Sequence, residues 1–158
     1  MKSVRIAALA FLSAGLVFAQ AAAPAHKDAN APVFMPAADL KWVDLDAKGA
    51  PGVKVADVWG DHTKGGYGAF IKFPAGFSTP LHYHTHAAKL VIISGTFLQT
   101  PEGKSEIRLG PGSYLMQPGK SYKHTTGCDK ASDCLFFSES TGAFDLIPVE
   151  GAGAPAKK

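Results

Sequence analysis

Glycine and proline interrupt the middle of this chain at short and regular intervals, which limits the length of any element that can form between them. Breakers such as Pro74-Ala75-Gly76, Gly110-Pro111-Gly112 and Pro118-Gly119 separate short runs of apolar or alternating residues. Outside the N-terminal segment, no run shows the apolar period of an amphipathic helix. About ten short strands in roughly 110 residues are typical of an all-β sandwich or barrel, and a jelly roll fits this pattern best.

The expected strands lie between these breakers and direct alternate side chains into the barrel. They cover residues 40–45, 53–58, 67–73, 81–84, 89–99, 105–109, 113–116, 121–125, 134–138 and 144–147. The apolar residues expected to face inward are Phe70, Phe73, Leu81, Leu90, Ile92 and Phe97. A jelly roll has an interior wide enough for one metal ion or small ligand.

The first 19 residues have the layout of a secretory signal peptide. Basic residues precede an apolar run from Ile6 to Ala19, and Val17-Phe18-Ala19 is a good small-x-small cleavage site. The apolar run is shorter than the about 20 residues that a membrane helix needs, although an uncleaved anchor is the alternative interpretation. The sequence therefore predicts a secreted or periplasmic protein without membrane contact after cleavage.

The rest of the chain divides into a linker, one folded domain and a tail. Residues 20–38 are rich in alanine and proline and predict a flexible linker, and residues 151–158 predict a flexible tail. The folded domain is expected over residues 39–150. Without the signal peptide, the chain carries 14 basic and 13 acidic residues, so it is nearly neutral. No basic cluster alternates with aromatic residues, which argues against nucleic-acid binding.

Three histidines, His82, His84 and His86, follow one another at a spacing of two, and His124 comes just after a second Gly/Pro-rich turn. Residues two apart in a strand point to the same face, so His82 and His84 should direct two imidazoles at one point. Imidazole nitrogen binds divalent transition metals, with Zn, Fe, Cu, Ni or Mn as the candidates here. The alternative interpretation is a solvated, histidine-rich strand edge. However, polar residues inside an apolar barrel are costly to desolvate unless they bind something.

The chain contains two cysteines, Cys128 and Cys134. An exported protein enters an oxidising compartment, where such a pair favours a disulfide. The bond would close a small loop and stabilise the fold by about 2 kcal/mol. The alternative is a pair of soft metal ligands beside His124, although the spacing is not that of a zinc knuckle.

These spacings resemble the first sequence motif of the cupin superfamily, G-x5-H-x-H-x3–4-E-x6-G. Gly76 is followed by five residues and then by His82 and His84, and the count back from Gly95 reaches Ala88. Alanine therefore stands where the motif has its carboxylate ligand. His86 either replaces that ligand, if the chain stays extended past His84, or is a turn residue at the mouth of the barrel.

The second cupin motif, G-x5-P-x-G-x2-H-x3-N, is matched less closely. Gly112 and Pro118 have the motif's spacing, but the segment to His124 is one residue longer than the pattern. Cys128 occupies the asparagine position. The resemblance nevertheless implies a single jelly-roll barrel in which His82, His84 and His124 bind the metal.

Several longer segments are similar to one branch of the superfamily, the DUF4437 type. They are DVWGD (57–61), FPAGF (73–77), VIISGT (91–96), LGPGSYLMQPG (109–119) and GAFDLIPV (142–149). Cupins include oxygenases, isomerases, sensors and storage proteins, so the resemblance alone supplies no reaction. It does imply a small-molecule ligand or substrate, and pairing through edge strands makes a homodimer the expected assembly.

Three functions remain open from the sequence. The first is binding or sensing of a small ligand by a metal-binding cupin, and the second is a metal-dependent oxygenase or isomerase acting on a small, anionic substrate. The third is a metal-free barrel that binds a partner. No acidic residue near the motifs is placed as a general acid or base, so no catalytic residue is assigned. Gln117, Tyr114, Met116 and Tyr122 are candidate pocket residues, Lys89 is expected to face solvent, and His62 is expected in an exposed loop.

Overall fold

Eleven short strands and one 3₁₀ turn, η1 (Ala37–Asp39), make up the regular structure of the computed structural model, which describes residues 31–151. The expected signal peptide, most of the expected linker and nearly all of the expected tail lie outside the described residues. All regular elements belong to the compact unit that begins at Phe34. Within residues 31–151, no helix has the length and apolar character required to cross a membrane.

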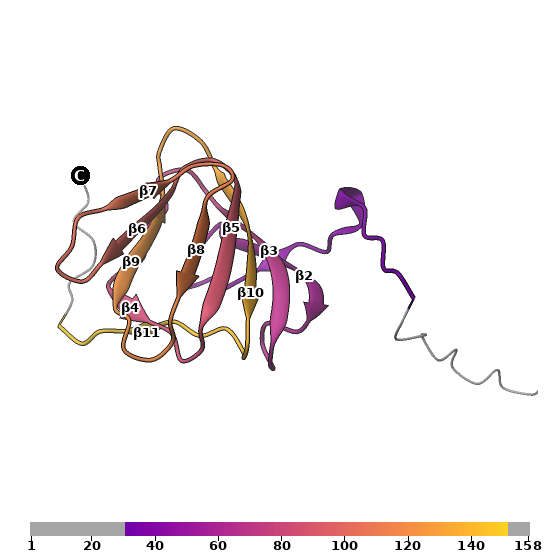
Figure 1. Cartoon of the computed structure of the whole chain (residues 1–158). Coiled ribbons are helices and arrows are strands. Elements are labelled where there is room, and N and C mark those ends of the chain that lie inside the picture. The colour runs from indigo at the N-terminus through magenta and orange to yellow at the C-terminus, as the bar shows by residue number, and fades with distance from the viewer. Residues whose placement is uncertain (1–30, 152–158) are drawn as a thin grey trace, which may run out of the picture. The chain divides into compact units, whose positions relative to one another are not determined.

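The strands form two antiparallel sheets, which Figure 1 shows as the two walls of a barrel. Sheet A contains, in spatial order, β1 (Val43–Asp44), β2 (Lys54–Gly60), β3 (Tyr67–Phe73), β10 (Cys134–Ser140), β5 (Ala88–Ser94) and β8 (Tyr114–Gln117). Sheet B contains β11 (Ile147–Pro148), β4 (His82–Tyr83), β9 (His124–Cys128), β6 (Phe97–Pro101) and β7 (Ile107–Leu109). The predicted all-β jelly roll is confirmed.

The core lies between the two sheets, and its centre is an aromatic cluster. Phe73, Phe97 and Phe136 are almost fully buried, and the ring of Phe136 lies 5.0 Å from each of the other two. Two residues expected to face inward do not belong to this core. Phe70 packs on the outer face against Phe137, because residues three apart in a strand point to opposite faces. Leu81 is half-buried, next to the inward-facing His82.

Among the expected strands, only 67–73 has the same bounds in the structure, and three of the others show larger differences. The run 89–99 is interrupted at Gly95, whose positive φ of 76° ends β5 and allows the chain to enter β6 in the opposite sheet. A Cβ atom at this glycine would lie 2.4 Å from the carbonyl oxygen of Asp133, so the turn requires glycine. The strand expected at 121–125 begins only at His124, and the one expected at 144–147 is reduced to β11.

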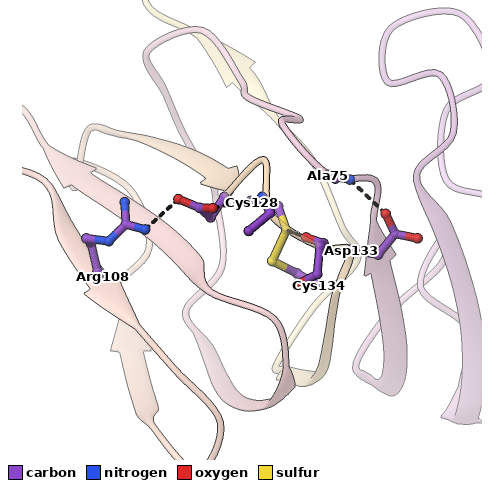
Figure 2. Close-up of a disulfide and its surroundings, with 8 residues drawn as sticks. Ala75, Arg108, Cys128, Asp133 and Cys134 are labelled. Atoms are coloured by element: carbon purple, nitrogen blue, oxygen red, sulfur yellow. Dashed lines mark hydrogen bonds and ion pairs between the residues drawn. A yellow bond between two sulfur atoms is a disulfide. The ribbon is translucent and has the colours of Figure 1, made fainter.

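Cys128 and Cys134 form a disulfide (Figure 2), and Cys128 lies at the opposite end of β9 from His124. Cys128 ends β9 in sheet B and Cys134 begins β10 in sheet A, so the bond links the two sheets. The loop between them is held from both sides. Asp133 accepts a hydrogen bond of 2.8 Å from the Ala75 amide, and Asp129 accepts one from Arg108, which lowers the Asp129 pKa.

Replacing both cysteines by alanine should lower the free energy of unfolding by about 2 kcal/mol, because the unfolded chain loses its covalent loop. Urea unfolding of the oxidised protein and of the double variant measures this difference. Thiol titration of the denatured, unreduced protein should find essentially no free sulfhydryl. Two free thiols per chain would contradict the disulfide and favour the cysteines as metal ligands.

Candidate metal centre

Three histidines from β4, from the residue after it and from β9 lie close together. His82 lies in β4, His84 directly follows that strand, and His124 begins β9. The pairing of β4 with β9 places His82 opposite His124. One ring nitrogen from each residue lies within 4.8 Å of the others, and the ring centroids are 4.4 to 5.3 Å apart. These residues are called the histidine triad below.

Each ring of the triad is oriented by a hydrogen bond from its Nδ1 atom to a backbone carbonyl. His82 donates to Pro80 over 2.9 Å, and His124 donates to Tyr122 over 3.0 Å. His84 donates to the carbonyl of Asp145. Because a carbonyl can only accept, the proton must be on Nδ1, which leaves the Nε2 lone pair free. Metal-binding histidines are fixed in this tautomer by the same kind of second hydrogen bond.

Burial keeps the triad neutral. His82 and His124 are 1 % and 0 % exposed, and desolvation lowers the pKa of each to about 4. Desolvation also lowers the pKa of His84. Within the described residues, Nε2 of His124 is buried without a hydrogen-bond partner. Such burial lowers the stability of the fold unless a bound group interacts with the nitrogen. Three neutral imidazoles with free Nε2 atoms are a donor set that fits a divalent transition metal.

His86 lies outside the triad. β4 ends at Tyr83, and the chain bends through the next residues, so it is not extended past His84 as a fourth histidine ligand would require. Instead, the His86 side chain is packed against Gly142, where an added Cβ would lie 2.4 Å from its ring. The residue is exposed and lines the cavity described next, which agrees with the turn interpretation.

A cavity of about 600 Å³ lies between the sheets, lined by His82 and His84 on one side. On the side of sheet A, one register row crosses four strands: Tyr67 of β3 pairs with Ser140 of β10, Ser140 with Ala88 of β5, and Ala88 with Gln117 of β8. All four are buried and line the cavity, and they are called the triad-side row below. Ala88, the position of the missing carboxylate, therefore lies in the cavity wall.

Alternation along the strands separates the remaining pocket candidates. Gln117 lines the cavity, whereas Tyr114 and Met116 are 59 % and 53 % exposed on the outer face of β8. They could not all face inward, because neighbouring residues of a strand point to opposite sides. Tyr122 stacks on His124 with the rings 4.9 Å apart. Lys89 faces solvent beside Glu139.

Asp145 positions one histidine of the triad, a role that the sequence did not predict. Its carbonyl oxygen accepts from His84, and its side chain accepts a hydrogen bond of 2.9 Å from the Thr85 amide. This residue therefore holds both the ring and the backbone at the end of β4. Its position within the segment GAFDLIPV was the available signal, but nothing in the spacing links that segment to the histidine motif.

A second group, formed by Asp57, Asp61 and His62, also brings ligand-type atoms within 4.8 Å of one another. His62 is not the exposed loop residue that was expected, since its side chain is only 11 % exposed. Its Nδ1 atom contacts Asp57 over 2.9 Å, and Asp61 pairs with Lys64 over 2.6 Å. Oδ1 of Asp57 is buried without a hydrogen-bond partner within the described residues, but the Asp61 carboxylate and Nδ1 of His62 are already engaged. The group therefore offers fewer free ligand atoms than the triad.

Solved structures with the same fold include enzymes and a cupin protein. The polyketide cyclase RemF from Streptomyces resistomycificus is 15 % identical, with a TM-score of 0.63 over 79 % of this chain and 90 % of that chain. An RmlC-like cupin from Ralstonia eutropha JMP134 is 20 % identical, with a TM-score of 0.61 over 78 % and 76 %. The DMSP lyase DddQ from Ruegeria pomeroyi DSS-3 is 20 % identical, with a TM-score of 0.58 over 73 % and 64 %. At these identities the likeness concerns the fold alone.

The two-sheet barrel has the same fold as these solved structures, one of which is an RmlC-like cupin. More narrowly, the model of the family described as "Domain of unknown function (DUF4437)" matches residues 7–147, and the chain belongs to that family. No curated protein matches the sequence.

Proposed function

We propose that this protein is an exported cupin that binds one divalent transition metal through His82, His84 and His124 and binds or senses a small ligand in the adjacent cavity. The observation that carries the proposal is the common orientation of the triad. Three carbonyls fix the Nδ1 protons, and the buried Nε2 atom of His124 has no partner within the described residues.

The ligand set suits a metal with open coordination positions. Three protein ligands are the number that metal sites commonly use when water or a substrate completes the shell. Because Ala88 replaces the usual carboxylate, the site carries one negative charge fewer, which favours an anionic group from the ligand. Zn, Fe, Cu, Ni and Mn remain the candidate metals.

Metal analysis tests the first part of the proposal. Protein purified from its native compartment should contain about one transition-metal ion per chain, and chelator-treated protein should take up one Zn²⁺ or Co²⁺ ion in a calorimetric titration. Absence of metal from the native protein, together with no uptake by the chelator-treated protein, would refute the proposed site and favour a metal-free barrel.

A metal-dependent enzyme is the second candidate, and one observation favours it. The phenol of Tyr67 lines the cavity, and burial raises its pKa to about 12, so it stays protonated and can donate a hydrogen bond to a bound substrate. RemF and DddQ are enzymes with this fold, although the likeness covers the fold only. An oxygen-consumption screen of the metal-loaded protein with small organic acids tests for an oxygenase and separates it from a protein that only binds a ligand.

Export is proposed from the N-terminal segment. The disulfide between Cys128 and Cys134 is consistent with an oxidising compartment. N-terminal sequencing of protein recovered from the periplasm or medium should begin near Gln20 or Ala22, because both follow small residues suited to cleavage. Recovery of exported protein that begins at Met1 would contradict processing and favour an uncleaved anchor.

A further inference from the structure

The inner face of sheet A changes from polar to apolar along the barrel axis. The triad-side row presents the side chains of Tyr67, Ser140 and Gln117, with Ala88 between the last two. The next row pairs Ala69 with Ser138, Leu90 and Leu115, and the row after that pairs Ile71 with Phe136 and Ile92. Polar side chains are therefore confined to the first two rows, and the third row contains only apolar side chains.

Sheet B changes in the same order. His82 and His124 pair at one end, Thr126 pairs with Gln99 further along, and Cys128 pairs with Phe97 beyond them. The hydroxyl of Thr126 donates to the side-chain carbonyl of Gln99 over 3.2 Å, so these two residues largely satisfy each other. Along sheet B, the inward side chains therefore change from imidazole, through a polar pair bonded to each other, to hydrocarbon.

The polar ends of the two sheets coincide. The short segment 84–87 joins β4 to β5, and the segment 118–123 joins β8 to β9, so the triad and the triad-side row lie at the same end. A hydrogen bond of 2.6 Å from the Lys120 amide to the His84 carbonyl ties these two connections together. At the opposite end, Gly95 connects β5 to β6, and the disulfide connects β9 to β10.

The charges of the cavity wall limit the ligand further. Among the described residues that line the cavity, none is a lysine or arginine, and Asp46 and Asp145 are the only carboxylates. A ligand with several negative charges would therefore be repelled, and one without a polar head would cover Gln117 and the triad without giving them a hydrogen-bonding partner. A single anionic group near the metal is the charge that this cavity can balance.

We infer that the ligand is an amphiphilic monocarboxylate, an inference that rests on the proposed metal site. Its carboxylate lies beside Ala88, in the space that a protein carboxylate fills in the four-ligand motif, with Gln117 and Tyr67 as hydrogen-bonding neighbours. The hydroxyl of Ser140 already donates to the Gly142 carbonyl over 3.0 Å. The hydrocarbon part of the ligand extends along Leu90 toward the aromatic cluster around Phe136. The volume of about 600 Å³ is within the range of pockets that hold such small molecules.

A chain-length series on the unaltered protein tests this inference. Calorimetric titration of the Zn²⁺-loaded protein should show octanoate binding on the order of a hundredfold more tightly than butanoate, because each buried methylene contributes about fourfold. Galacturonate, a hydroxylated monocarboxylate, should bind more weakly than octanoate. Equal affinity for octanoate and butanoate, or tighter binding of galacturonate, would overturn the inference.

A matched pair of variants tests where the carboxylate lies. Ala88→Glu supplies the missing carboxylate inside the cavity, whereas Ala87→Glu makes the same change at an exposed neighbour. The first should retain Zn²⁺ but lower octanoate affinity at least about tenfold, and the second should change neither. Unchanged octanoate affinity in a Zn²⁺-loaded Ala88→Glu protein would overturn the placement of the head group.

The titrations distinguish an error in the ligand class from an error in the metal site. If the unaltered protein takes up one Zn²⁺ ion but octanoate binds no better than butanoate, the ligand class is wrong and the metal site stands. If no Zn²⁺ binds, the metal site itself is refuted. If octanoate binds equally well before and after removal of Zn²⁺ by a chelator, the cavity holds the hydrocarbon but the metal does not hold the head group, which also overturns the inference.

Discussion

Replacing His84 by alanine should lower the affinity for Zn²⁺ by at least about a hundredfold. Loss of a hydrogen-bonding partner behind a metal ligand already costs about 10- to 100-fold, and His84→Ala removes the ligand together with its bond to Asp145. The fold should be little affected, because His84 lies outside the strand and outside the aromatic core. Competition titration with a chelator measures the affinity, and urea unfolding of the metal-free variant measures the stability.

His86→Ala is the matched control, because it removes the same side chain two residues further along. The ring of His86 is packed against Gly142 rather than among the triad, so metal affinity should not change. If His86→Ala weakens Zn²⁺ binding as much as His84→Ala, the segment 84–87 rearranges on binding and the site has four histidines. A closed shell of this kind would favour a binding role over catalysis.

A third variant tests the site as a whole. The double replacement of His82 and His84 removes both ligands contributed by the β4 segment and leaves only His124 of the triad. Full metal occupancy in this protein would refute the proposed site, whatever the single variants show. Loss of metal in the double variant, with retention in His86→Ala, would establish a three-histidine site with open positions.

The sequence predicted which residues carry the site better than it predicted how they are held. The spacing of His82 and His84 and the position of His124 depend on local motifs, which can be counted in one sequence. The period-two argument, however, assumed a strand through His84, and β4 ends at Tyr83. What positions His84 is the carbonyl of Asp145, which is 61 residues away, and no local pattern encodes that contact.

Strand register explains the other differences between the sequence-based predictions and the structure. Tyr67 and Ser140 were not selected from the sequence, because their position beside Ala88 depends on the alignment of β3, β10 and β5. That alignment follows from long-range pairing and from the turn at Gly95, whereas a single sequence shows only the alternation within each strand. The fold class was predicted correctly and many strand bounds were not, because turn residues mark only the approximate ends of strands.

Acidification from pH 7 to pH 5 should lower the unfolding free energy of the metal-free protein by up to about 4 kcal/mol. In the unfolded chain a histidine takes up a proton near its ordinary pKa of 6.5, whereas burial holds the pKa of His82 and His124 at about 4 in the folded protein. Protons therefore favour the unfolded chain between these values. The stabilisation is complete above pH 6.5 and is lost as the pH falls toward 4, with at most about 2 kcal/mol per histidine lost by pH 5.

Two single variants identify the groups responsible for this pH dependence. His82→Gln and His124→Gln each replace a titrating ring with a neutral amide, so each should remove at most about 2 kcal/mol of the difference in unfolding free energy between pH 7 and pH 5. The lowered pKa of His84 leaves a further contribution in both variants. Aspartates with lowered pKa values, such as Asp61 and Asp129, lose their contribution only below their ordinary pKa of 3.8, outside this range. Urea unfolding in the presence of a chelator measures each difference. If both glutamine variants kept the full pH dependence, the two buried histidines would not be the groups that resist protonation. This result would contradict the neutral state of the triad, on which its free Nε2 atoms depend.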